Sequence, residues 1–220
     1  MAVTFTGFEP ADFDLFSIPD FPGRMGEIRS RLRPKLLALG ADLAERVSDL
    51  VEQPLFPHAA QHMRRRVNPP EESWAAFGRD KRGYKRWAHY RIAVSGAGVR
   101  VTVFVEDDAD DKPVLAAALQ SAAGEILRAL GSAPVHWYTL DGAATGAPTG
   151  AATGRDVTPA VLAAVGERLG RLKLLKFQAG VPLPREAALR MTPEAFEHWA
   201  LEQVALLRPL YHAASSAPSP

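Results

Sequence analysis

Between residues 88 and 106, large apolar residues recur at every second position, the spacing of a β-strand whose two faces meet different surroundings. A two-residue turn at Gly96-Ala97 would set Val94 opposite Val99, and each further apolar residue would then also face an apolar partner. A three-residue loop would shift the register and misalign the two patterns. We therefore predict a β-hairpin. Its opposite face would carry residues that can line a site: His89, Arg91, Arg100 and Thr102.

Apolar residues spaced three and four apart predict helices outside this hairpin. One such stripe follows Pro34, and another fills residues 113–130. Thr158-Pro159 and Thr192-Pro193 each combine an N-capping hydroxyl with a proline suited to the first helical turn. The last helix is expected to end near Pro209. The apolar stripes are expected to pack into the core.

Shorter apolar segments at 73–77, 135–140 and 172–181 predict further strands. Helices and strands do not alternate in the regular series of a parallel α/β fold. A chain of 220 residues also suits a single domain. We therefore predict the α+β class, with helices around about five strands, at least two of them antiparallel, in one domain over residues 1–211.

Three polar segments are predicted to lie outside the regular elements. Residues 141–156, DGAATGAPTGAATGRD, are expected to form a flexible surface loop, and they lack the Gly-Lys-Ser/Thr ending of a P-loop. The acidic cluster EDDADD at 106–111 is interpreted as a solvated loop before the next helix, although its carboxylates can also hold a magnesium ion. Residues 212–220 are expected to form a disordered tail.

Charge is distributed unevenly along the chain, although the net charge is only +1. Residues 56–91 hold nine of the 26 Lys and Arg residues and three of the 25 acidic ones, so this segment carries +6 and the remainder −5. A local positive field on a slightly acidic body favours an anionic partner.

Composition narrows the possible classes of protein. There is no cysteine, which excludes disulfides, thiolate metal sites and thiol catalysis. The N-terminus lacks the pattern of a signal peptide. No apolar run approaches the roughly 20 residues of a membrane helix. We expect a cytoplasmic protein with no membrane contact.

His58 and His62 are the candidate metal ligands. Pro57 is expected to open a helix that runs to Arg66, in which residues four apart share a face, as in some zinc sites. The stretch reads H-A-A-Q-H, however, without the glutamate of an HExxH motif, and neighbouring arginines would repel a cation. We therefore expect neither a metal nor another cofactor, and these histidines are better interpreted as hydrogen-bonding or packed groups.

Two basic motifs suggest a ligand. RRRVNPPEESW offers arginines suited to bidentate recognition of phosphate or carboxylate, and GRDKRGYKRWAHY mixes cations with aromatic rings, as in sites for single-stranded nucleic acid. On residue types alone, both motifs also fit a solvated basic surface. No RNP, KH or helix-turn-helix signature is present, and no G-x-S-x-G motif supports serine catalysis.

With these motifs, the chain resembles the YktB-like family of uncharacterised bacterial proteins. The resemblance spans residues 3–211 and rests on VTFTGF, FPHAAQHMRRRVNPP, WAAFG, KRGYK and VPLPRE. It implies a single compact α+β domain with an antiparallel sheet flanked by helices, but no particular activity. Ala88 stands where the family pattern leads us to expect proline. The matching positions of the central pattern are Phe56, Pro57, His58, His62, Arg64, Arg65, Val67, Asn68, Pro69, Pro70, Trp74, Phe77, Gly78, Arg82, Gly83, Tyr84, Lys85 and His89.

The leading hypothesis is a site for a phosphate-bearing anionic ligand, nucleic acid or a nucleotide. The expected phosphate contacts are Arg64, Arg65, Arg82 and Lys85. The expected stacking residues are Trp74 and Tyr84, and the residues expected to orient the ligand are His58, His62, Asn68 and His89. One alternative is a phosphoester hydrolase or nucleotide transferase that uses a histidine among His58, His62 and His89 as acid or base. The other is a scaffold whose basic face meets an acidic protein.

Overall fold

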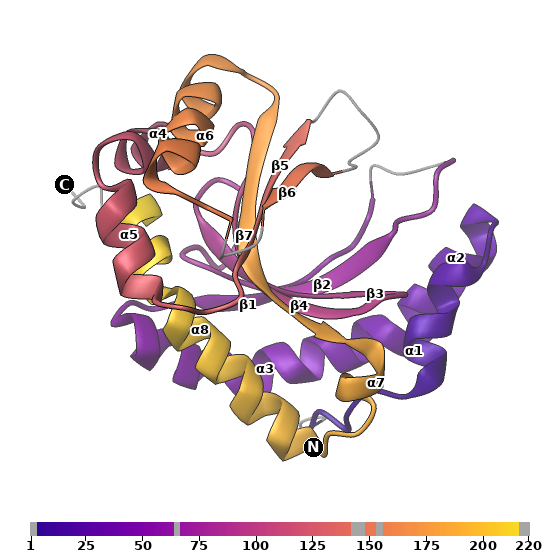
Figure 1. The fold of residues 1–220 in the computed structure, drawn as a ribbon. Coiled ribbons are helices and arrows are strands. Elements are labelled where there is room, and N and C mark those ends of the chain that lie inside the picture. The colour runs from indigo at the N-terminus through magenta and orange to yellow at the C-terminus, as the bar shows by residue number, and fades with distance from the viewer. Residues whose placement is uncertain (1–3, 64–66, 142–147, 153–155, 216–220) are drawn as a thin grey trace.

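The computed structural model describes residues 4–63, 67–141, 148–152 and 156–215. Its centre is one antiparallel sheet of seven strands in the order β1-β2-β3-β4-β7-β5-β6 (Figure 1). The strands are β1 (Phe56–Ala59), β2 (Glu72–Gly78), β3 (His89–Ser95), β4 (Gly98–Val105), β5 (His136–Asp141), β6 (Pro148–Ala152) and β7 (Leu175–Pro184). The α+β class predicted from the sequence is confirmed, with two more strands than expected.

Helices cover one face of the sheet. In Figure 1, α3 and α8 run along the same side of β2, β3 and β4, and α4, α5 and α6 gather beside one end of β7. The helices are α1 (Pro10–Asp14), α2 (Phe21–Glu27), α3 (Arg33–Val51), α4 (Lys112–Ser121), α5 (Ala123–Leu130), α6 (Pro159–Arg171), α7 (Arg185–Ala188) and α8 (Pro193–Ser215). A 3-10 turn at Leu15–Ser17 follows α1, and a π-helical turn at Ile28–Leu32 joins α2 to α3. None of the helices in the described part of the chain is long and apolar enough to cross a membrane.

The predicted β3–β4 hairpin is confirmed. Val94 pairs with Val99 and Tyr90 with Val103, so the turn holds two residues, Gly96 and Ala97. The alternating Tyr, Ile and Val side chains of both strands are buried. Alternation sufficed here because only this register brings all of them to the same face.

The core lies between this face and α3 and α8. Tyr90 stacks on Tyr211 of α8 with ring centroids 4.8 Å apart, and its hydroxyl donates to the Val204 carbonyl at 3.3 Å. Leu39 of α3 and Leu207 of α8 are fully buried. The helical stripes thus form the second layer of the core, as predicted.

The helix predicted from Pro57 to Arg66 is wrong. Residues 56–59 form the edge strand β1, in which His58 lies opposite Ala76 of β2. His62 follows with a φ of 51°, in the left-handed region, which an α-helix does not contain. Pairing with the sheet overrides the helical spacing in this stretch. Arg64, Arg65 and Arg66 lie outside the described residues.

Three further boundaries differ from the predictions. Strand β6 occupies residues 148–152 of the segment expected to be a flexible loop, and residues 113–130 divide into α4 and α5 at Ala122. Helix α8 passes Pro209 and continues to Ser215, so the tail predicted from residue 212 begins at least four residues too early. Burial of Leu210 and Tyr211 favours continuing the helix, although Pro209 lacks one backbone donor.

Because β4 and β7 approach each other closely, we predict that position 180 does not accept a side chain. A Cβ there would lie 2.1 Å from the Val101 carbonyl oxygen, whereas a Cβ at Gly26 in α2 would meet nothing within 4 Å. We expect Gly180→Ala to lower the free energy of unfolding by roughly 1–3 kcal/mol or more. Gly26→Ala should raise it by about 0.5–1 kcal/mol because alanine has the higher helix propensity. Urea unfolding measures both, and equal stability of the two variants would contradict the packing described.

Candidate aromatic and basic site

The sheet's second face points away from α3 and α8, and no helix of the described chain lies over β2, β3 and β4 on that side (Figure 1). We call it the helix-free face. It carries Trp74 from β2, His89 and Arg91 from β3, and Phe104 from β4. Tyr84 from the β2–β3 loop and Glu106 after β4 complete a group that we call the aromatic cluster.

Arg91 lies at the centre of the aromatic cluster. Its side chain is only 4% exposed, its Nε donates to His89 Nε2 at 2.9 Å, and its Nη2 donates to Glu106 Oε1 at 2.6 Å. Its guanidinium carbon is 3.4 Å from the centroid of the Phe104 ring and 4.4 Å from that of the Trp74 ring. Cation–π attraction and two hydrogen bonds therefore hold this buried charge in one orientation.

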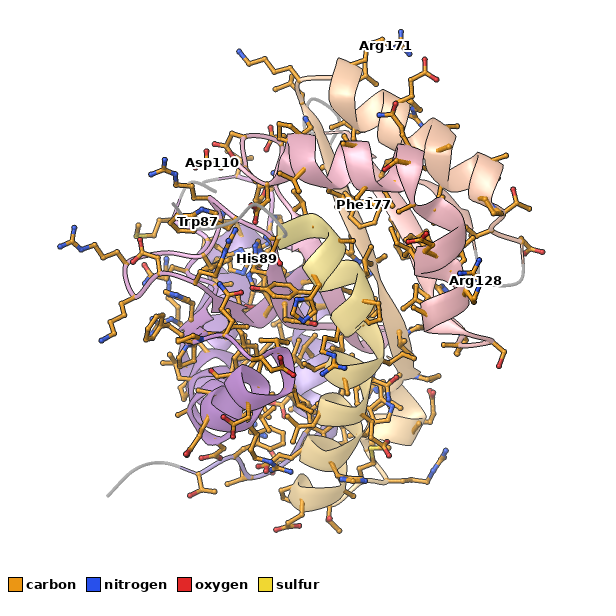
Figure 2. The ribbon with its side chains drawn as sticks, turned by 90° about the vertical axis from the view of Figure 1, so that its left-hand side faces the viewer. Trp87, His89, Asp110, Arg128, Arg171 and Phe177 are labelled. Carbon is orange, nitrogen blue, oxygen red and sulfur yellow. The ribbon has the colours of Figure 1, made fainter. Side chains whose placement is uncertain are left out.

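The hydrogen bonds of His89 define its tautomer. Its Nε2 must accept because the Arg91 guanidinium can only donate, so Nδ1 carries the proton and donates to the Trp87 carbonyl at 2.8 Å. Burial and the nearby charge of Arg91 hold the pKa of His89 well below its usual value of 6.5. His89 is therefore a neutral residue that positions Arg91. Figure 2 shows it close to Trp87.

Glu106 neutralises the buried arginine. Burial acts to raise the pKa of Glu106, but the charge of Arg91, together with the charge and hydrogen bond of Lys176, outweighs it and lowers that pKa to about 2. Lys176 Nζ donates to Glu106 Oε2 at 2.7 Å, and Lys85 Nζ lies 4.0 Å from Oε1. Glu106 is thus an ionised buried carboxylate surrounded by three cations.

Tyr84 packs over the cluster on the helix-free face. Glycine at position 78 leaves room for it, because the Cβ of any other residue there would lie only 2.5 Å from the Tyr84 Cβ. The Tyr84 ring centroid is 5.2 Å from that of His58 and 4.8 Å from that of His89, and its hydroxyl accepts from Trp74 Nε1 at 2.9 Å. Burial raises the pKa of Tyr84 above 10, so its hydroxyl stays protonated.

The basic loop, residues 79–87, is attached to the acidic segment 106–111. Arg79 pairs with Asp111, whose carboxylate also accepts from the Ala88 amide at 2.8 Å. Arg86 pairs with Asp110 at 2.6 Å, and Figure 2 shows Trp87 and Asp110 on the same part of the surface. The interpretation of 106–111 as a wholly solvated loop is therefore wrong, because Glu106 and Asp111 are buried partners of arginines.

Besides Arg86, which pairs with Asp110, three cations of the basic loop project outward. Lys81 and Arg82 are exposed, and the Lys85 side chain is 59% exposed. Lys81 Nζ lies 5.1 Å from the centroid of the Phe56 ring, and the Arg82 amide donates to Asp80 Oδ1 at 2.8 Å. Their charges therefore face solvent directly beside the aromatic cluster.

The structure brings together only part of the predicted site. His58, Trp74, Tyr84 and His89 are in contact, and Lys85 and Arg82 lie on the adjoining loop. Asn68 is exposed and contributes nothing to the cluster's contacts, and Arg64 and Arg65 lie outside the described residues. The site residues that sequence reasoning missed are Phe104, Glu106 and Lys176. The signal that could have found two of them is the alternation of side chains along β4. It places Phe104 and Glu106 on the same face of the sheet as Arg100 and Thr102.

His58 and His62 have different partners. His58 Nε2 is 2.9 Å from the Asp80 carbonyl oxygen, and His62 Nε2 is 3.2 Å from Ser73 Oγ. The His62 ring packs edge-on against Trp74 with centroids 5.3 Å apart. The shared helical face that suggested a metal pair does not form. Across the described ranges, no group of three or more His, Asp or Glu side chains is arranged to hold a metal ion.

The polar members of the cluster are buried, with His89, Arg91 and Glu106 each no more than 4% exposed. Two hollows of ≈ 540 Å³ and ≈ 370 Å³ lie elsewhere, the first between α3 and α8 and the second where residues 107–113 meet 169–173. Neither includes a ring of the cluster.

Together, the fold and the site define an α+β protein with a cation–aromatic cluster on the helix-free face of an antiparallel sheet. Residues 8–211 match the family described as a domain of unknown function, DUF1054. The chain belongs to this family, which is the YktB-like family that its motifs resemble.

Curated relatives come from Bacillus species. A UPF0637 protein of Bacillus cytotoxicus is 30% identical over 216 residues, which cover 96% of this chain and 98% of the relative. A UPF0637 protein of Bacillus velezensis is 31% identical over 190 residues, 86% of this chain and 87% of the relative. One of Bacillus cereus is 42% identical over 94 residues, 43% of this chain and 45% of the relative.

The lowered pKa of His89 predicts how stability depends on pH. The unfolded state binds a proton near pH 6.5 that folded His89 does not, so this contribution is present above pH 6.5 and lost below it. We expect the free energy of unfolding to fall by up to about 1.4 kcal/mol per pH unit between pH 6 and pH 5. His89→Gln should remove this slope, and His198→Gln, at an exposed position, should keep it. Urea titrations measure the slopes, and an unchanged slope in His89→Gln would contradict the assignment.

The buried pair predicts a large effect at Glu106. Glu106→Gln leaves Arg91 charged and buried, which should cost roughly 3–5 kcal/mol of stability at neutral pH. The exposed neighbour Asp108 provides the control, because Asp108→Asn should change stability by no more than about 0.5 kcal/mol. In the wild type the same stabilisation is present above the unfolded pKa of 4.5 and is lost as pH falls through about 2. Chemical unfolding distinguishes the variants, and similar losses in both would argue against a buried pair.

Proposed function

We propose that the protein binds a phosphate-bearing ligand, a nucleotide or single-stranded nucleic acid, at the aromatic cluster and the basic loop. The observation that carries the proposal is the position of the outward cations Lys81, Arg82 and Lys85 beside the partly exposed rings of His58 and Trp74. Rings that accept a base and cations that meet its phosphate are the two parts of such a site.

The division of charges supports this choice of ligand. Arg79, Arg86 and Arg91 are paired with Asp111, Asp110 and Glu106, so their charges are largely balanced within the protein. Lys81 and Arg82 are exposed charges that an external anion meets first, and Lys85 is also exposed although it pairs with Glu106. Trp74 rests on Arg91, which fixes the plane of the ring that a base would stack on.

Binding fits the site better than acid–base catalysis. His89 is neutral and hydrogen-bonded at both nitrogens, and the Tyr84 pKa lies above 10. A phosphoester hydrolase or nucleotide transferase that used His89 would need this residue to exchange protons near neutral pH. We place the binding in the cytoplasm, which suits a chain without cysteine.

Fluorescence anisotropy with labelled single-stranded DNA, single-stranded RNA and duplex, at low and moderate salt, tests the proposal. We expect salt-sensitive binding with a log–log slope of about −0.7 for each phosphate neutralised on a single strand. Arg82→Ala/Lys85→Ala should reduce the magnitude of that slope and weaken affinity on the order of tenfold. Trp74→Leu should weaken affinity by about 1–3 kcal/mol without changing the slope.

The matched control removes two cations elsewhere. Arg128 and Arg171 are exposed, and Figure 2 shows both well away from Trp87 and His89. Arg128→Ala/Arg171→Ala alters net charge equally and should leave affinity nearly unchanged. Absence of binding at low salt, or equal weakening by both double variants, would overturn the proposal.

A further inference from the structure

A second group of rings and cations lies on the helix-free face, on the strands farther from the basic loop. Tyr138 and His136 project from β5, and the Tyr138 hydroxyl is 3.0 Å from His136 Nδ1. The guanidinium carbon of Arg100 on β4 lies 5.9 Å from the Tyr138 ring centroid. Both rings are partly exposed, and the proposed site uses none of these three residues.

The sheet register relates this group to the aromatic cluster. Arg91 pairs with Thr102, Thr102 with Gly180, and Gly180 with His136, so all four lie in one row across the sheet. Counted along the sheet, His136 lies three strands from Arg91, and Tyr138 lies four strands from Trp74. The two groups therefore occupy separate parts of the face.

Small residues separate the two groups. Between Arg91 and His136 the row holds only Thr102 and Gly180, and the neighbouring row holds Ala93 beside Trp74. Within the described part of the chain, Thr102 Oγ1 is buried without a hydrogen-bond partner. An unsatisfied buried hydroxyl is costly. A polar ligand across this row, directly or through an ordered water, would supply a partner.

Arg100 links the two groups. It pairs with Glu72, which lies two residues before Trp74 on the same face of β2, and its guanidinium also approaches Tyr138. Both members of the ion pair are about a quarter exposed. Since such pairs contribute little to stability, a phosphate can replace Glu72 at modest cost. Arginine also suits phosphate because its planar donors match the phosphate oxygens.

We propose that Tyr138, His136 and Arg100 form a second base-binding subsite, and that the ligand is a single strand crossing the helix-free face from Trp74 to Tyr138. This inference rests on the proposed function and narrows it from any phosphate-bearing ligand to an oligonucleotide. Two ring platforms on one face suit an extended strand, since stacking tolerates any base and the backbone follows the cations between the rings.

A length series tests the inference. Calorimetric affinities are compared for a mononucleotide, a dinucleotide and single strands of about 4 to 16 nucleotides, as DNA and as RNA. We expect affinity to rise with length until both subsites are filled. Tyr138→Leu should weaken binding of the longer strands about 5- to 150-fold, the equivalent of 1–3 kcal/mol for one stacked base, and leave mononucleotide binding unchanged. Trp74→Leu should weaken binding at every length.

Tyr138→Phe is the matched control because it keeps the ring and removes only the hydroxyl that meets His136. It should bind long strands nearly as the wild type does. Thermal unfolding of each variant shows that loss of binding is not loss of fold. If Tyr138→Leu binds long strands like the wild type, or if Tyr138→Phe loses as much affinity as Tyr138→Leu, the second subsite is overturned and the proposed function stands.

Two further outcomes separate the inference from the proposed function. Duplex binding as tight as single-strand binding would overturn the inference, because paired bases cannot stack on both rings, and would leave phosphate binding intact. Failure of every nucleotide and strand to bind would overturn the proposed function itself, and the inference with it.

Discussion

The buried ion pair between Arg91 and Glu106 constrains the whole helix-free face. A guanidinium that is only 4% exposed must have a counter-charge and filled donors, and Glu106 and His89 supply both. Phe104 and Trp74 then lie against its plane. The rings of the candidate site are therefore positioned by a charge beneath them, and the strands that carry them must keep this register.

The same constraint explains why the acidic segment at 106–111 follows β4. Glu106 continues the alternation of β4 onto the helix-free face, and Asp110 and Asp111 hold the arginines at both ends of the basic loop. Four of the nine cations of residues 56–91, namely Arg79, Lys85, Arg86 and Arg91, thus pair with this acidic segment. The loop is held firmly at its ends, and its middle presents cations to solvent. That arrangement suits a preorganised binding surface, because less ordering is needed when a ligand arrives.

The two faces of the sheet have separate roles. Tyr90, Val101 and Phe177 bury one face against α3 and α8, which accounts for stability. The other face carries rings, cations and small residues. The proposed binding of a nucleotide or single strand uses these rings and cations. The DUF1054 family match covers both faces, since it spans residues 8–211.

The local sequence pattern alone predicted the α+β class, the β3–β4 register and the helix starts at Thr158 and Thr192. These features depend on alternation and capping, which act over a few neighbouring residues. The sequence motifs also identified His58, Trp74, Tyr84 and His89 as candidate site residues. Only the tertiary structure showed that residues 56–59 form a strand, that α8 passes Pro209, and that Glu106 and Lys176 join the cluster. These features depend on partners distant in sequence: β2 for His58, the core for Tyr211 and β7 for Glu106. Their burial and pairing energies exceed the local preferences on which sequence patterns depend.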